Sequence, residues 1–175
     1  MKRFLPLVWC LMLFQIAQAQ TSRIVSGSTA FSVKFILGTC EGTFDAPTGK
    51  ANFNETNLNN SSFDISIPAN SFKTNNNSRD KDMKSEKYFF VTKYPNIHFK
   101  STQIEKKANH YQATGTLTIR DVTKTVSLPF EAVKNNDGGY TLSSSFDINR
   151  LDYKVGQKDW KLKDIVTVKL KAVIH

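Results

Sequence analysis

The chain has 175 residues, of which 24 are Lys or Arg and 15 are Asp or Glu, so its formal charge is +9. A basic chain can attract nucleic acid or anionic lipid headgroups. The basic residues are scattered, however, and no block of five like charges occurs, so we interpret the charge as that of a solvated exterior and expect no nucleic-acid partner.

The first residues have the layout of a secretory signal peptide. Lys2 and Arg3 precede an apolar run from Phe4 to Ile16, and Ala17-Gln18-Ala19 offers a small-x-small cleavage site. The run is shorter than the ~20 residues that span a bilayer, and no later stretch comes near that length. We therefore expect residues 1–19 to be removed and the mature protein to be periplasmic or secreted from a bacterium.

Cleavage leaves residues 20–175, a length that suits a single domain. The alternative is a lipoprotein anchored through Cys10, but the bulky Trp9 stands where such a site needs a small residue. After cleavage only Cys40 remains. Because one cysteine cannot form an internal disulfide, we expect the apolar core alone to hold the fold.

Alternating apolar residues dominate the rest of the chain. Successive side chains of a β-strand point to opposite faces, so a period of two predicts strands with one apolar face and one wet face. Repeated along the chain, this pattern favours an antiparallel sheet. The alternation covers residues 31–37, 63–67, 97–99, 117–119, 126–130, 142–148 and 166–174.

Turn-forming residues separate these runs. Clusters of Pro, Gly, Asn and Asp at residues 47–49, 57–60 and 135–139 predict loops, and the last of them predicts a hairpin. Pro129 falls inside an apparent strand. Since proline has no N–H to donate, it predicts an edge or a bulge there.

One segment, residues 75–87, is polar and does not alternate. Asn77 or Ser78 could cap a short helix over residues 79–85, which could lie across the mouth of a barrel. A plain surface crossover is the other interpretation.

Long alternating strands in one domain close into a barrel or stack as a sandwich, because open edges invite aggregation. Small residues at the parity of the apolar face either meet large partners or leave a cavity. About eight strands is the size at which a barrel can hold one small ligand. The small residues are Ala113, Gly115, Ala132, Ser144 and Ala172.

We find no constellation of residues that predicts catalysis. His98 lies between two apolar strand residues and is expected to face water, His110 lies in a turn, and His175 ends the sequence. No pair has metal-ligand spacing, and nucleophile, phosphate-loop and dinucleotide motifs are absent. We therefore expect no enzymatic activity, no metal and no cofactor, and we rank an isomerase or hydrolase last among the alternatives.

Four stretches carry a resemblance to a known family. The string SRDKDMKSEKYFFVTKYPNIHFKS at residues 78–101 is the most specific of them. SVKF at 32–35, GTLTIR at 115–120 followed by VTK at 122–124, and NRLDY at 149–153 agree with it. Together they resemble the YceI-like family of bacterial polyisoprenoid-binding proteins over essentially the whole mature chain.

The resemblance implies an exported lipocalin-like antiparallel β-barrel of about eight strands, with one short helix or crossover near residues 78–87. It also implies an elongated apolar tunnel that binds an isoprenoid, a fatty-acyl lipid or a similar long-chain amphiphile. Three positions depart from the family pattern: Asp82 stands where many relatives have His, Asp121 replaces the usual turn glycine, and Lys154 follows Tyr153 where glycine is common. Aspartate tolerates a left-handed turn, so Asp121 need not disturb its hairpin.

The expected ligand contacts are the large apolar residues at the inward parity, with arginines at the mouth of the barrel as headgroup contacts. Arg79 and Arg150 are these arginines, and the alternative is that they hold loops in place. The rival function is a solid-cored barrel that binds proteins or responds to stress, and a homodimer stays open. The expected apolar contacts are Phe31, Val33, Phe35, Phe63, Ile65, Phe89, Ile97, Phe99, Leu117, Ile119, Leu128, Phe130, Phe146 and Ile148.

Overall fold

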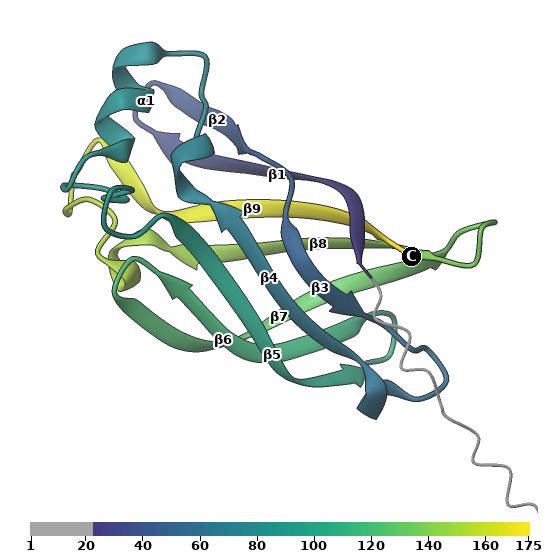
Figure 1. The fold of residues 1–175 in the computed structure, drawn as a ribbon. Coiled ribbons are helices and arrows are strands. Elements are labelled where there is room, and N and C mark those ends of the chain that lie inside the picture. The colour runs from purple at the N-terminus through teal and green to yellow at the C-terminus, as the bar shows by residue number, and fades with distance from the viewer. Residues whose placement is uncertain (1–22) are drawn as a thin grey trace, which may run out of the picture.

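The computed structural model describes residues 23–175, which form a curled antiparallel sheet with one α-helix (Figure 1). The expected signal peptide lies outside the described residues. The strands are β1 (Ile24–Phe35), β2 (Gly38–Phe44), β3 (Thr48–Asn52), β4 (Ser62–Pro68), β5 (Asn96–Lys106), β6 (Tyr111–Ile119), β7 (Val122–Lys134), β8 (Tyr140–Asn149) and β9 (Leu162–Ile174). The helices are α1 (Asn77–Lys84) and the single 3-10 turns η1 (Leu58–Asn60), η2 (Ala69–Ser71) and η3 (Arg150–Tyr153).

The predicted all-β antiparallel fold with one short helix is confirmed, with nine strands in the described chain instead of about eight. The strands β2 and β3 were not predicted from the alternation of apolar residues. Their residues, GTCEGTF and TGKAN, carry too few large apolar side chains to alternate. They are strands because neighbouring strands supply their hydrogen-bond partners, which is a tertiary effect.

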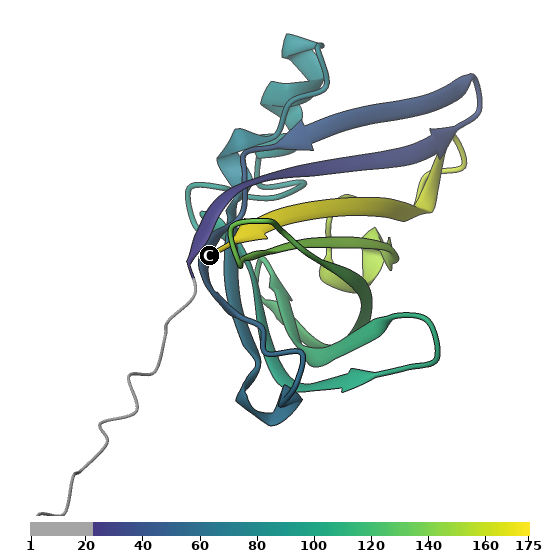
Figure 2. The same cartoon turned by 90° about the vertical axis from the view of Figure 1, so that its right-hand side faces the viewer.

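The strands follow the order β2-β1-β9-β8-β7-β6-β5-β4-β3, with every neighbouring pair antiparallel. The edge strands β2 and β3 are consecutive in the chain, so the sheet has to roll for them to be joined. Figure 2 shows the resulting half-barrel. Two bridges across the opening, Thr43 to Lys73 and Arg23 to Lys50, hold the rolled edges near each other.

The strong curl of the sheet has a visible cause in β5 and β6. The pairing register shifts between Ser101 and Gln103, which is the signature of a β-bulge. Opposite the bulge, a Cβ on Gly115 would lie 2.2 Å from the carbonyl oxygen of Lys100. Only glycine allows this close approach of two strands, so Gly115 is small because backbone occupies its space.

Pro129 lies at a change of partner in β7. Val122–Phe130 pair with β6, whereas Glu131–Lys134 pair with β8, so β7 changes partner just after Pro129. The missing N–H of proline therefore costs no ladder hydrogen bond. Where β7 and β8 no longer pair, the Ser144 hydroxyl of β8 donates to the Pro129 carbonyl of β7 at 2.5 Å.

The predicted helix exists, but its cap differs from both predicted residues. Asn75 has a positive φ of 58°, which turns the chain, and the next residue, Asn76, is extended. The side chain of Asn76 accepts a hydrogen bond from the Arg79 N–H at 3.0 Å. The predicted caps Asn77 and Ser78 are wrong because the chain already turns helical after Asn76.

The first predicted strand also ends earlier than its alternation suggested. Phe35 pairs with Gly38, so Ile36 and Leu37 are the two residues of a tight hairpin turn. Leu37 was placed on the inner face by its parity, and it is instead 88% exposed. The register of a hairpin depends on its turn, which periodicity does not specify.

Candidate ligand-binding site

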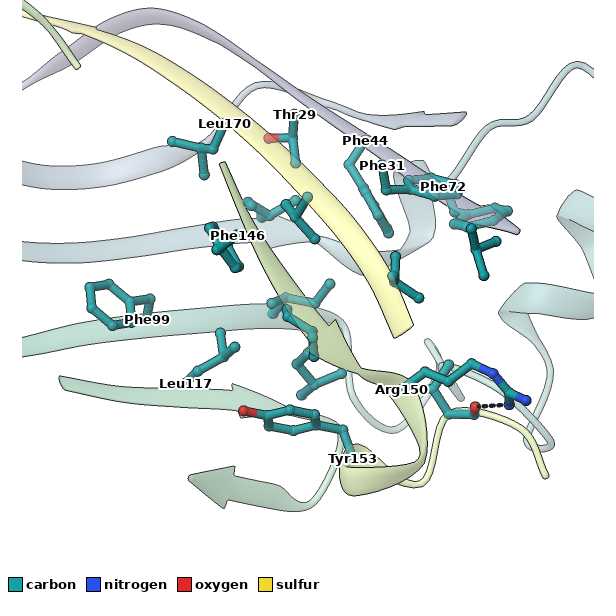
Figure 3. A pocket seen from close by; sticks show the side chains of 18 of the residues that line it. Thr29, Phe31, Phe44, Phe72, Phe99, Leu117, Phe146, Arg150, Tyr153 and Leu170 are labelled. Atoms are coloured by element: carbon teal, nitrogen blue, oxygen red, sulfur yellow. Dashed lines mark hydrogen bonds between the residues drawn. The ribbon is translucent and has the colours of Figure 1, made fainter. Parts of the chain in front are cut away.

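The rolled sheet encloses an apolar cavity of about 340 Å³ (Figure 3). This volume lies within the range of ~300–1,000 Å³ that is usual for small-molecule sites. Inward side chains of β1, β2, β4 to β9 and the segment around α1 supply its walls. The interior is therefore not a solid core.

All of the sixteen residues expected to contact a ligand line this cavity, including Arg79 and Arg150. They come together because strand parity fixes which side chains point inward once the sheet is rolled. Their contact with a lipid stays a prediction. The structure adds lining residues that sequence reasoning missed, chiefly Thr29, Cys40, Phe44, Ile67, Phe72, Met83, Tyr88, Tyr153, Val155, Leu162, Val166, Val168 and Leu170.

Four rings, Phe53, Tyr111, Phe130 and Tyr140, pack together at one end of the half-barrel, and we call them the aromatic plug. One of them, Phe130, lines the cavity. The Phe53 ring centre lies 5.0 Å from that of Tyr111, 5.7 Å from Phe130 and 5.1 Å from Tyr140, all edge to face. The Tyr111 hydroxyl donates to Glu55 at 3.1 Å. Burial first, and then this carboxylate, raise the pKa of Tyr111, so its hydroxyl stays protonated.

A second group of rings forms the wall beside α1. Phe31 stacks on Phe72 at 4.9 Å, and Phe44 meets Phe72 and Phe89 at 5.5 and 5.7 Å. Phe72 is 3% exposed although it lies in a loop. It was missed because no alternation surrounds it, and only its single large ring in a polar stretch could have singled it out.

Arg150 is buried, and its donors are taken by the protein. Its guanidinium donates to the carbonyls of Lys163 and Val155 at 3.2 and 3.0 Å and to Asp164 at 3.2 Å. These bonds tie η3 to β9. The expected alternative, an arginine that holds loops, therefore describes these contacts, and a headgroup contact stays untested.

Like Arg150, Arg79 uses its guanidinium to hold neighbouring backbone in place, here at the start of α1. Its Nε and Nη2 donate to the hydroxyl and carbonyl of Thr74 at 2.6 and 3.2 Å. Asp80 accepts from the same hydroxyl and from the Thr74 N–H at 2.6 and 2.9 Å. The pair thus fixes the loop before the helix, while the guanidinium reaches the cavity wall.

Polar atoms are scarce in the cavity wall. Thr29 is 3% exposed, and its hydroxyl has no hydrogen-bond partner among residues 23–175. Figure 3 shows it on the wall near Leu170, with which it pairs across β1 and β9. Cys40 is half-buried, and desolvation raises the pKa of its thiol, with Arg79 acting in the opposite direction. The thiol is therefore neutral at physiological pH.

The end opposite the aromatic plug is apolar up to the surface. Phe35 lines the cavity and is also 36% exposed. It pairs with Leu162, a second lining residue, where the β1–β2 turn meets the start of β9. A ligand that leaves at this end crosses a hydrophobic rim.

The described residues hold no constellation for metal chemistry. Within residues 23–175, no group of three His, Cys, Asp or Glu side chains is placed to hold a metal ion. His98 points to the outer face, as expected, where its Nε2 lies 2.7 Å from Asp64. This hydrogen bond lowers the pKa of the Asp64 carboxyl. In the same part of the chain no helix is long and apolar enough to cross a bilayer.

Comparison with known proteins gives relatives over part of the chain. A UPF0312 protein of Photorhabdus laumondii is 38% identical over 102 residues, which covers 57% of this chain and 53% of that protein. The YceI protein of Salmonella arizonae is 34% identical over 96 residues, covering 55% and 50%. The chain thus aligns with about half the length of the curated relatives it matches.

Solved structures share the fold over most of the chain. Burkholderia cenocepacia BcnA superposes with a TM-score of 0.78 at 24% identity, covering 84% of this chain and 95% of that one. Campylobacter jejuni YceI gives 0.68 at 26% identity, with 77% and 83% covered. A polyisoprenoid-binding domain from Saccharophagus degradans gives 0.69 at 11% identity, with 89% and 98% covered.

The profile of the YceI-like domain matches residues 16–174, which is nearly the whole sequence. The motifs at residues 78–101 and 115–124 lie inside this match, and the solved YceI structure has the same rolled sheet. The chain belongs to the YceI-like family.

Proposed function

We propose that this protein is an exported binding protein that holds the hydrocarbon chain of an isoprenoid or another long-chain amphiphile inside its half-barrel. The observation that carries the proposal is the apolar cavity of about 340 Å³, bordered at one end by Phe130 of the aromatic plug and at the other by Phe35 and Leu162. The structural similarity to a polyisoprenoid-binding domain supports the same ligand class.

The driving force in this proposal is removal of hydrocarbon from water. Burial contributes ~0.8 kcal/mol per CH₂, so ten buried groups give about 8 kcal/mol before the costs of immobilisation. Since almost every lining side chain is apolar, retention needs no specific hydrogen bond. We therefore expect tight retention with weak discrimination among chains of similar length.

The test is extraction of lipid from the purified protein, identified by mass spectrometry, together with uptake of a fluorescent prenol or fatty acid. The variant Val168→Trp places a large ring in the cavity from the middle of β9. Its matched control is Ile165→Trp, on the same strand but 48% exposed. Uptake should fall in the first variant only. Lipid-free protein that takes up neither probe would refute the proposal.

The export part of the proposal rests on the basic start, short apolar run and Ala-x-Ala site of the first nineteen residues. Mass spectrometry of the protein isolated from the periplasm of an expressing bacterium tests it. We expect a mature N-terminus at Gln20. An unprocessed chain in the cytoplasm would contradict this step and leave the ligand proposal standing.

A further inference from the structure

Exposed apolar side chains gather beside the open end of the cavity. Leu37 is 88% exposed, Trp160 78%, Ile36 54% and Phe35 36%. We call these four residues the apolar lip. Singly exposed apolar residues are ordinary, but here a tryptophan and two aliphatic residues are exposed together on two adjoining turns.

The two turns that carry the lip are fixed to each other. The Ile36 N–H donates to the Lys161 carbonyl at 3.0 Å, and Phe35 pairs with Leu162. The Asp159 side chain accepts from the Lys161 N–H at 2.8 Å, which closes the turn that presents Trp160. In Figures 1 and 2 the β1–β2 turn and the turn before β9 lie side by side. Hydrogen bonds thus fix the two turns on which the exposed side chains of the lip lie.

Lysines surround the lip. Lys34, Lys158, Lys161 and Lys163 are all exposed, and the Lys161 ammonium lies 5.3 Å from the centre of the Trp160 ring. The acidic residues on the same segments are Asp159 and Asp164. Asp164 is already paired with Arg150 and Lys158, so positive charge prevails at this surface.

We propose that the apolar lip docks the protein on an anionic lipid bilayer, with the open end of the cavity facing the membrane. Tryptophan and aliphatic side chains favour the bilayer interface, and lysines near the surface attract anionic headgroups. Phe35 and Leu162 line the cavity and adjoin the lip, so a hydrocarbon chain can pass between bilayer and cavity without crossing water. This inference rests on the proposed function, because it gives the route by which the bound lipid enters or leaves.

The experiment measures flotation of the protein with vesicles of phosphatidylcholine, with or without a third of phosphatidylglycerol. In the mature chain that starts at Gln20, Trp160 is the single tryptophan and reports insertion as a blue shift of its fluorescence. We expect binding that increases with phosphatidylglycerol and falls with salt. The double variant Leu37→Ser, Trp160→Ser should bind about ten-fold more weakly. Lys161→Gln should weaken binding about five-fold.

The matched control is Val133→Ser, which removes a 62% exposed apolar side chain at the other end of the half-barrel. It should bind vesicles like the unmodified protein. Equal loss in the control and the lip variant, or no vesicle binding by the unmodified protein, would overturn the proposal. A concentration-dependent dimer that the lip variant abolishes, without vesicle binding, would also overturn it and identify a second copy as the occupant.

Uptake of a fluorescent prenol dispersed without vesicles separates this inference from the proposed function. Lip variants that keep uptake of dispersed prenol but lose its transfer from vesicles support the docking surface. Uptake without any vesicle binding refutes docking and leaves the ligand proposal intact. Vesicle binding without uptake refutes the ligand proposal and, with it, the transfer route.

Discussion

The guanidinium of Arg150 donates to the carboxylate of Asp164 at 3.2 Å, with their side chains only 7% and 17% exposed. The pair connects η3 to β9 across the sheet, beside the open end of the cavity. Removing one member of a buried ion pair leaves the other charge poorly solvated. We predict that Arg150→Met lowers the free energy of unfolding by about 2–3 kcal/mol, measured by urea denaturation.

The control for this prediction is Lys124→Met, which breaks the exposed pair of Lys124 with Asp152 at 3.2 Å. It should cost no more than about 0.5 kcal/mol, since the Asp152 carboxylate that remains is exposed to water. Equal costs for the two variants would show that Arg150 is not a structural residue and would return it to the candidate headgroup contacts.

Thr29 gives a prediction of opposite sign. Its hydroxyl is buried without a partner among the described residues, so it loses hydration and gains nothing in return. Thr29→Val keeps the shape of the side chain and should stabilise the lipid-free protein by about 1 kcal/mol in thermal or urea unfolding. Thr114→Val, which removes a hydroxyl bonded to Ser127 at 2.9 Å, should not stabilise it. A destabilising Thr29→Val would mean that a bound water satisfies the hydroxyl.

The empty volume itself can be tested with a larger ring. Phe99 lines the cavity, so Phe99→Trp has room to expand and should cost less than about 1 kcal/mol of stability while lowering lipid uptake. Phe53 belongs to the aromatic plug and is 5% exposed. Phe53→Trp should therefore lose about 1–3 kcal/mol by overpacking. Similar costs at both positions would argue for a filled interior.

The reactivity of the Cys40 thiol can report whether the cavity holds lipid, and this reactivity depends on pH. Burial raises the pKa of its thiol in the folded protein, so less thiolate is present at a given pH than in the unfolded chain. In the mature chain that starts at Gln20, where Cys40 is the single cysteine, iodoacetamide should therefore react more slowly between pH 7 and 9 with the native than with the denatured protein. Bound lipid should slow the reaction further because Cys40 lines the cavity.

The sign of the linked effect on stability follows from the same shift. The folded state holds the thiol proton more tightly than the unfolded chain does. The stabilisation that results is fully present below the unfolded pKa of ~8.5 and is lost as pH rises through the folded pKa. Cys40→Ser should remove this part of the alkaline decline in unfolding free energy. An unchanged decline would assign it to other groups.

Strand parity made most of the cavity wall predictable. Phe31, Phe63 and Phe146 point inward because a strand alternates its side chains whatever sheet it joins, so their face could be read from neighbouring residues alone. Elements without alternation were not predictable in this way. Phe72 and β3 owe their places to partners that are distant in the chain.

The amino-acid sequence by itself determined the antiparallel sheet, the family and the inward side of each alternating strand, because those depend on local periodicity and short motifs. The tertiary structure alone decided that the rings of the aromatic plug pack together at one end of the half-barrel, that Arg150 pairs with Asp164, and that the turns carrying Leu37 and Trp160 adjoin at the other end. Each of these depends on strand register and sheet curvature, which arise from contacts between residues far apart in the sequence.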